Sequence, residues 1–329
     1  MLGAINWDVS IFEERFARPG EEVPVRLVEE FSGGKGANVA SAAARILGRG
    51  RVAFVGALGD DEVSGMQLGV LRQEGVATDG VIILKGRRSG RAYIIVDREG
   101  RKTIHTHFGA NEGIRPRHLA TSGPSRALKR SSMVVLMDVP LPVAARAARA
   151  ANESGAVLLY SPGVRSREGM GNLEGVVRAS DFLVVDTHEL RNLGGSVDED
   201  SCLDTLRGTF PSQTIVATLG ERGCVIAKGG ATTRVGGVVL AALGKKAVNS
   251  TGSGDAFLGV FASHLLMGMS PASSALWANL AGALKATKYE TRGSPRLREL
   301  EDTMKRLERL KSSGLGLDTG SPKAAGHAA

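Results

Sequence analysis

The chain has 329 residues, of which 42% are hydrophobic and 23% charged, an ordinary globular composition that excludes disorder over most of its length. No segment approaches the ~20 consecutive apolar residues of a membrane helix, and the first residues lack a secretory signal pattern, so we expect a cytoplasmic protein that is neither membrane-bound nor exported. Its two cysteines, Cys202 and Cys224, form no CxxC pair and are too few for a disulfide framework. Because Cys224 falls in an apolar strand and Cys202 in a helix, we expect both to be inert.

The net charge is +8, with 42 basic against 34 acidic residues. A charge of this sign suits polyphosphate ligands, and it also suits nucleic acid. The basic residues are spread along the chain, and aromatic residues make up only 4%, which supplies few platforms for base stacking. We therefore expect no nucleic-acid partner.

The first third of the chain carries short strand-like segments separated by turn residues. They cover residues 9–12, 23–31, 91–96 and 102–107, and residues 97–100 form a good hairpin tip. A helix at 37–47 and an apolar strand at 51–58 interrupt them. This arrangement predicts a small β-sheet lid, built from residues of about 9–31 and 88–108, that projects from a larger sheet.

From about residue 130, apolar runs alternate with helical patterns. Strands are predicted at 133–138, 156–160, 182–186, 214–219 and 224–227, and helices at 143–154, 167–179 and 199–207. Continuous apolar strands alternating with helices predict an α/β core with a parallel sheet covered by helices on both faces. Two further helices follow, at 271–288 and 296–311. We expect one domain over residues 1–312 and a disordered tail over 313–329.

The strongest chemical signal is the segment NSTGSGDAFLGV at residues 249–260. A glycine-rich turn leads into an apolar helix, and the unpaired N–H groups at a helix N-terminus form an anion site. Asp255 in the first turn is placed to accept a proton from a hydroxyl nucleophile. The alternative is that Asp255 only caps the first turn of a core helix.

A second signal is SGGKGAN at residues 32–38, which leads into an alanine-rich helix. With Asn6 and Asp8 in the segment GAINWD, the side chains of Lys35 and Asn38 make a polar set suited to sugar hydroxyls. The alternative is a glycine end to a lid strand with a solvated lysine. The chain has neither a G-x-x-x-x-G-K-[ST] loop nor a dinucleotide G-x-G-x-x-G fingerprint, so those two nucleotide-binding classes are excluded.

Taken in order, GAINWD, SGGKGANVASAAARILG, GALGDDEVSG, TLGERG and NSTGSGDAF resemble the PfkB or ribokinase-like family of carbohydrate and nucleoside kinases over residues 1–310 or so. The resemblance implies a ribokinase-like α/β core with a β-sheet lid. It also implies transfer of the γ-phosphate of ATP, with Mg²⁺, to a hydroxyl group.

The resemblance further implies a role for each matching residue. Asp255 would be the catalytic base, and Gly252, Ser253 and Gly254 would form the anion hole. The sugar would be held by Asn6, Asp8, Gly34, Lys35 and Asn38. ATP would be bound by Asp186, Thr218, Gly220, Gly223 and Asn279, and Glu189 would act on Mg²⁺ through water.

The chain departs from the family pattern at three places. Asp186 replaces the asparagine of the N-x-x-E motif, and a second carboxylate there could strengthen Mg²⁺ binding or repel ATP. Asn249 replaces an aspartate that helps to form a monovalent-cation site in ribokinase-like members, which leaves activation by potassium open. Residues 161–163, Ser-Pro-Gly, look more like archaeal nucleoside kinases.

Several alternatives for function stay open. A pentose is the first expected acceptor, at a primary hydroxyl, with fructose 6-phosphate and nucleosides as runners-up. Arg87, Arg88 and Arg91 are either a solvated hairpin or ligands of a phosphate on the acceptor. His105 and His107 share a strand face and are expected on the lid surface rather than on a metal. A non-catalytic sensor of sugar or nucleotide is the rival class, and exposed lid edges predict a homodimer.

Overall fold

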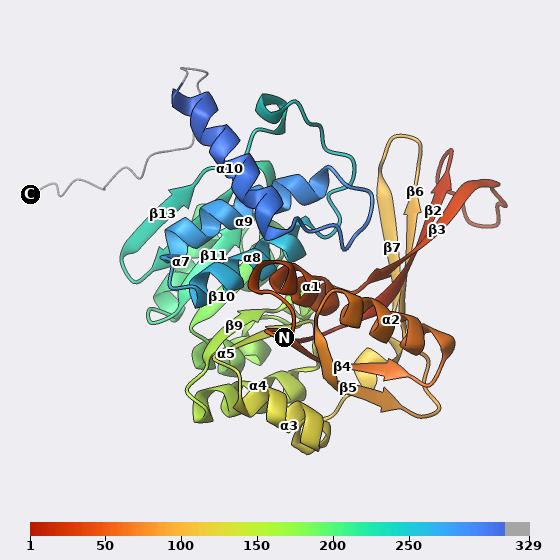
Figure 1. Ribbon diagram of the computed structural model, residues 1–329, viewed down its shortest axis with the longest axis horizontal. Coiled ribbons are helices and arrows are strands. Elements are labelled where there is room, and N and C mark those ends of the chain that lie inside the picture. Colours follow the sequence, from red (N-terminus) through yellow and green to blue (C-terminus); the bar gives the residue numbers. More distant parts are fainter. Residues whose placement is uncertain (313–329) are drawn as a thin grey trace, which may run out of the picture.

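A nine-stranded sheet runs through the computed structural model, which describes residues 1–312 (Figure 1). Its strands are β1 (Leu2–Gly3), β4 (Ala53–Gly59), β5 (Ala77–Leu84), β8 (Met133–Met137), β9 (Val157–Ser161), β10 (Phe182–Asp186), β11 (Thr214–Thr218), β12 (Cys224–Lys228) and β13 (Ala231–Val235). They lie in the order β13-β12-β11-β10-β9-β8-β1-β4-β5. All neighbours from β11 to β5 pair in parallel, whereas β12 pairs antiparallel with both β11 and β13.

Helices cover both faces of this sheet (Figure 1). One face packs against α3 (Ser122–Lys129), α4 (Leu141–Glu153), α5 (Met170–Ala179), α6 (Thr187–Gly194) and α7 (Glu199–Thr209). The other face packs against α1 (Lys35–Leu47), α2 (Glu62–Gln73), α8 (Ser253–Leu266), α9 (Pro271–Ala286) and α10 (Leu297–Ser312). The connections also contain short 3₁₀ turns at Gly109–Gly113, Pro116–Ala120, Gly163–Glu168, Gly220–Arg222 and Leu240–Leu243.

The position of strand β8, covered by helices on both faces, explains why its sequence is continuously apolar. Val134 and Leu136 pack into the core beneath α4, while Val135 packs into the opposite core beneath α8. Because successive side chains of a strand point to opposite faces, a strand covered on both sides must be apolar at every position. The predicted doubly covered parallel sheet is therefore confirmed.

A second, four-stranded sheet stands beside the core and forms the lid, at the right of Figure 1. Its order is β3-β2-β6-β7, from β2 (Asn6–Glu13), β3 (Val25–Gly33), β6 (Gly90–Val96) and β7 (Lys102–His107). The predicted hairpin tip is confirmed, since the amide of Gly100 donates to the Asp97 carbonyl. Apolar side chains of the lid are half exposed, among them Leu27 and Ile104. Dimerisation through the lid stays a prediction.

The predicted strands and helices of the core and lid are present, with ends that differ by a few residues. Helix α2 was not predicted, because it buries only Val63, Gln67 and Leu71 and contains two glycines, which weakens its apolar pattern. Strand β1 was missed because it has only two residues, and β5, β13, α3 and α6 were not predicted either. The predicted disordered tail, 313–329, lies outside the described residues. Within residues 1–312, none of the helices has the length and apolar character needed to cross a bilayer.

Candidate active site

A cavity of about 280 Å³ lies between the lid and the carboxyl ends of the central strands. Four neighbouring strands contribute lining residues at these ends: Asp138 after β8, Ser161 of β9, Asp186 of β10 and Thr218 of β11. In open α/β sheets, the crevice at the carboxyl ends of the strands is where ligands bind. The lid closes the other side with Ala92, Ile94, Ile104, Thr106 and Phe108.

The first glycine-rich turn lies at the junction of lid strand β3 and helix α1. A Cβ atom on Gly33 would lie 2.0 Å from Oδ2 of Asp8, so only glycine leaves room for that carboxylate beside the turn. Asp8 is 6% exposed and accepts a hydrogen bond of 3.1 Å from the Thr291 hydroxyl. Burial raises the pKa of Asp8 to about 7, although this hydrogen bond and nearby Arg292 oppose the shift.

The second glycine-rich turn precedes α8. Gly252 takes a left-handed conformation, with φ of +86°, and a Cβ atom there would lie 2.1 Å from the Thr291 carbonyl oxygen. No side chain caps the N-terminus of α8. Gly252 and Gly254 line the cavity, so the positive end of the helix faces the space where a ligand would lie.

Asp255 lies where the two turns meet. Its Oδ2 atom accepts a hydrogen bond of 2.8 Å from Nδ2 of Asn38, which belongs to α1. The carboxyl group lines the cavity and is 7% exposed. Burial raises its pKa to about 6, while the Asn38 hydrogen bond and the charge of Lys35 act in the opposite direction. A carboxylate with a pKa near neutrality is suited to accept a proton from a hydroxyl group.

Carboxylates surround Lys35 on the floor of the cavity. Its Nζ atom lies 3.5 Å from Oδ2 of Asp138 and 4.0 Å from Oε1 of Glu189. Burial acts against the charge of Lys35, but these carboxylates, with those of Asp255 and Asp186, hold its pKa above the ordinary value. Burial raises the pKa of Glu189 to about 7, helped by the neighbouring charge of Asp186.

Asp186 and Glu189 form a capping box at the start of α6. The Glu189 amide donates to Oδ1 of Asp186 at 2.8 Å, and the Asp186 amide donates to Oε2 of Glu189 at 3.1 Å. This structural role leaves Oε1 of Glu189 directed toward Lys35 in the cavity. Carboxylate oxygens are the donors that Mg²⁺ prefers. No group of three or more His, Cys, Asp or Glu side chains in the described chain is arranged to hold a metal by itself, so water and phosphate oxygens would have to complete the coordination.

The cavity brings together most of the residues expected from the sequence. Those that line it are Asn6, Asp8, Gly34, Lys35, Asn38, Asp186, Thr218, Glu189, Gly252, Gly254 and Asp255.

The remaining expected residues lie outside the lining. The hydroxyl of Ser253 is buried without a partner among the described residues, between two glycines that do line the cavity. Gly220 and Gly223 lie in the turn after β11. Asn279 of α9 donates to the carbonyls of Val235 and Gly236 and so fixes the segment after β13. The structure does not gather Gly220, Gly223 and Asn279 into this cavity.

Other side chains of the site were not singled out from the sequence. Asp138 has a positive φ of 52° and accepts a hydrogen bond of 2.7 Å from the Val164 amide. Its place directly after a buried strand was a usable signal, because strand ends form the ligand crevice. Arg292 donates to Oδ1 of Asn38 and to the Gly33 carbonyl. Nothing in its local sequence marks Arg292, which lines the neighbouring larger groove and reaches Asn38 only through the tertiary fold.

The three arginines considered as phosphate ligands do not line the cavity. Arg91 pairs with Glu62 at 2.8 Å, and Arg87 and Arg88 also lie outside the lining. His105 and His107 are exposed on β7. Cys202 and Cys224 are buried, and burial raises the pKa of the Cys224 thiol to about 12.

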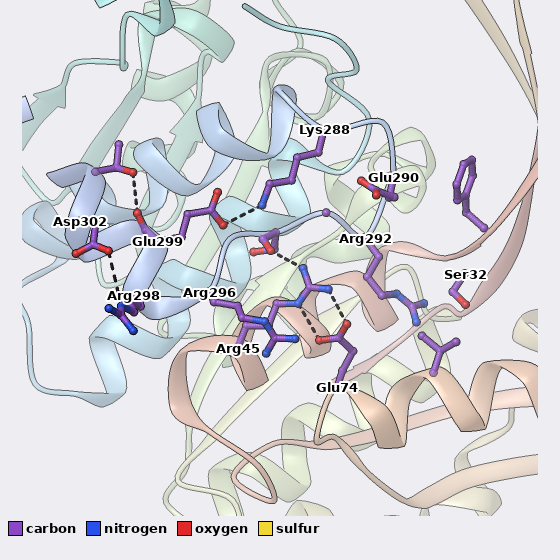
Figure 2. Close-up of a pocket in the computed structure, with 15 residues that line it drawn as sticks. Ser32, Arg45, Glu74, Lys288, Glu290, Arg292, Arg296, Arg298, Glu299 and Asp302 are labelled. Atoms are coloured by element: carbon purple, nitrogen blue, oxygen red, sulfur yellow. Dashed lines mark hydrogen bonds and ion pairs between the residues drawn. The ribbon is translucent and has the colours of Figure 1, made fainter. Parts of the chain in front are cut away.

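A larger groove of about 820 Å³ lies between α10, the end of α1 and the segment after α9 (Figure 2). Its charged side chains pair with each other: Arg45 with Glu74 at 2.6 Å, and Lys288 with Glu299 at 2.9 Å. None of the residues expected at the site lines this groove. We therefore place the candidate active site in the smaller cavity.

The charge balance around Lys35 can be tested without a ligand. Lys35→Met removes the cation from the cluster of carboxylates, and we expect a loss of about 1–2 kcal/mol in the free energy of unfolding near pH 8. The loss is modest because 40% of the side chain stays accessible to water. The pKa values of Glu189 and Asp255 already lie above their unfolded values, and without the cation they rise further. The deficit is therefore larger near pH 8 than near pH 5, where these groups bind protons.

Urea titrations at the two pH values measure this difference, and Lys129→Met, on the exposed end of α3, is the control. A loss in Lys35→Met that is the same at both pH values would contradict the account.

The match to known proteins agrees with this geometry. A model of the pfkB family of carbohydrate kinases matches residues 1–297. The chain is 28% identical over 290 residues to a bifunctional ribokinase/ribose-5-phosphate isomerase A from Fructilactobacillus sanfranciscensis. That alignment covers 86% of this chain and 52% of the relative, so the chain spans about half of that protein's length.

A second relative is matched over nearly its whole length. It is an ATP-dependent ribose-1-phosphate kinase from Halopiger xanaduensis, 27% identical over 293 residues, with 89% of this chain and 93% of that protein covered. Among solved structures, Arabidopsis thaliana ribokinase complexed with ribose and ATP has the same fold, with a TM-score of 0.82 at 22% identity and coverage of 92% and 97%. The resemblance noted in the sequence is confirmed: the chain belongs to the pfkB family of carbohydrate kinases and is an ATP-dependent kinase.

Proposed function

We propose that this protein transfers the γ-phosphate of ATP to a primary hydroxyl group of a small sugar, with ribose as the first candidate. The observation that carries the proposal is the position of Asp255, a buried carboxylate in the cavity between two glycine-rich turns. One turn borders polar groups suited to hydroxyls, and the other ends at an uncapped helix N-terminus suited to an anion.

Asp255 is proposed as the general base. In its ionised form it accepts the proton of the acceptor hydroxyl as that oxygen attacks the γ-phosphorus and the bond to the β-γ bridging oxygen breaks. The Asn38 hydrogen bond orients the carboxylate and leaves Oδ1 available for the substrate. Since phosphoryl transfer asks mainly for positioning and charge stabilisation, the N-terminus of α8 at residues 252–254 is proposed to stabilise the transferring group.

Mg²⁺ fits the donor chemistry beside Lys35, where Glu189 and Asp186 would act through water, and it would neutralise charge on the ATP phosphates. The ATP roles of Thr218, Gly220, Gly223 and Asn279 are part of the proposal. Thr218 borders the cavity, and the other three continue from it along the β11–β13 edge. This edge is where we place the nucleotide.

The lining favours a neutral sugar over a phosphorylated one. Asp8, Asp138 and Asn6 offer acceptors and donors for vicinal hydroxyls, with Lys35 beside them. Acidic groups outnumber basic ones among the described lining residues, and Arg87, Arg88 and Arg91 lie outside. A phosphate on the acceptor would therefore meet carboxylates without a matching arginine. The name of the first relative contains ribokinase and supports ribose, whereas the name of the second, a ribose-1-phosphate kinase, supports a pentose but a phosphorylated one.

The base is tested by Asp255→Asn, which keeps the shape of the side chain and the Asn38 contact but removes the charge. We expect kcat to fall at least ~100-fold while ATP and sugar affinities stay within a few-fold. Coupled measurement of ADP release gives kcat, and calorimetry gives the affinities. Asp204→Asn, which removes a surface partner of Arg207, is the control and leaves both unchanged. Undiminished transfer by the Asp255 variant would show that another group is the base.

The acceptor is tested with a panel of ribose, fructose, fructose 6-phosphate, ribose 1-phosphate, adenosine and inosine, each offered with Mg-ATP. We expect ribose to have the highest kcat/KM, at least ~10-fold above either phosphorylated sugar, because of the carboxylates in the cavity. A preferred sugar phosphate would overturn the acceptor assignment but not the kinase. If none of these acceptors is phosphorylated although ATP binds, a non-catalytic sensor of sugar or nucleotide would be favoured.

A further inference from the structure

Lys285, in the last turn of α9, is fully buried, with 0% exposure. Its Nζ atom donates to the carbonyl oxygen of Asn249 at 2.8 Å and to that of Lys288 at 3.4 Å. Within residues 1–312, no carboxylate lies within ion-pair distance of this ammonium group. Its partners are backbone carbonyl groups.

A buried ammonium group without a carboxylate partner is costly to the folded state. Burial lowers the pKa of Lys285 to about 8, with the charge of Asp255 acting in the opposite direction. The position at the C-terminal end of α9 recovers part of this cost through the helix dipole. A solvated lysine at the same helix end would gain that benefit without the burial, so the dipole alone does not explain the buried position.

The location of the ammonium group gives a second observation. Asn249 directly precedes the glycine-rich turn of α8, and the Cε atom of Lys285 lies 3.5 Å from where a Cβ atom on Gly252 would be. The Asn249 side chain also donates to the Tyr289 carbonyl at 2.7 Å, so the same two segments are tied twice. Lys285 therefore places a positive charge directly behind the turn that faces the cavity.

The carbonyl oxygens of Asn249 and Lys288 are also ligands of the kind that coordinate a free monovalent cation. Potassium and ammonium ions are similar in size, and backbone carbonyl oxygens bind both. The ammonium group of Lys285 occupies the position between two carbonyl groups that such an ion would need. Because Asn249 is neutral, its side chain adds no carboxylate that would draw in a metal ion.

We propose that Lys285 serves as a built-in monovalent cation, which holds the 249–252 turn in shape and supplies positive charge behind the transferring phosphate. The inference rests on the proposed kinase function for its catalytic part. It makes an exchangeable potassium ion unnecessary in this chain. Lys285 is a positioning residue, since Gly252 and Gly254 of the turn, and not Lys285, line the cavity.

The test compares wild type, Lys285→Met and Lys288→Met in buffers whose only monovalent cation is tetramethylammonium, before and after addition of K⁺, NH₄⁺ or Na⁺. The first readout is melting temperature. Lys285→Met leaves the two carbonyl oxygens without their donor, so a cation can bind there. We therefore expect K⁺ and NH₄⁺ to raise the melting temperature of this variant more than Na⁺ does, while the wild type shows no such difference. This readout needs no substrate.

The second readout is ADP release with the best acceptor. We expect the wild-type rate to change less than about two-fold on addition of K⁺, and Lys285→Met to lose about 10- to 100-fold in kcat, with partial recovery in K⁺ or NH₄⁺. Lys288→Met keeps the carbonyl that Lys285 uses and loses only the pair with Glu299 seen in Figure 2, so it should behave as wild type.

Two results would overturn the inference. One is a wild-type enzyme whose rate or melting temperature rises specifically with K⁺. The other is a Lys285→Met variant that is destabilised without any cation-specific recovery, which would make Lys285 a structural tie only. A wild type that phosphorylates no acceptor but shows the expected melting temperatures would contradict the proposed function and leave the cation assignment intact.

Discussion

The site depends on one buried hydrogen bond, from Asn38 to Asp255, which joins two turns 217 residues apart in sequence. The bond can form only because α1 and α8 start side by side on the same face of the sheet, where Val39 and Leu258 share one core. Burial beneath these helices raises the pKa of the Asp255 carboxyl group, and the hydrogen bond from Asn38 limits that rise. The packing of two helices thus sets both the position and the proton affinity of the proposed base.

Positively charged side chains lie on two sides of the Asp255 carboxyl group. Lys35 lies on the cavity side among Asp138 and Glu189, and Lys285 lies behind the glycine-rich turn against backbone carbonyls. From the lid, Lys102 donates to the Thr251 hydroxyl at 2.6 Å, which connects the lid to the same turn. Cations on several sides of this turn fit its proposed role in binding the transferring phosphate, with the lid excluding water.

The sequence predicted what depends on local pattern. The apolar strands, the lid hairpin and both glycine-rich turns follow from periodicity and turn chemistry, and the motifs led to Asp255, Asn38 and Lys35. Arg292 and Lys285 could not be found this way, because their contacts with distant segments arise only from tertiary packing. Asn279 is a different case: only the family resemblance implied a role with the nucleotide, which stays a prediction, and in the structure its amide donates to the segment after β13.

The most direct test of this account is the pH dependence of kcat, measured between about pH 5 and 8 in wild type and in Asn38→Ala. The account predicts a rate that rises as pH passes about 6, where Asp255 loses its proton. It also predicts that the rise moves to higher pH in Asn38→Ala, because the lost hydrogen bond stabilised the ionised form. Asn152→Ala, at an exposed position near the end of α4, should leave the profile unchanged. A flat wild-type profile, or the same midpoint in both proteins, would contradict the claim that Asn38 tunes Asp255 as the base.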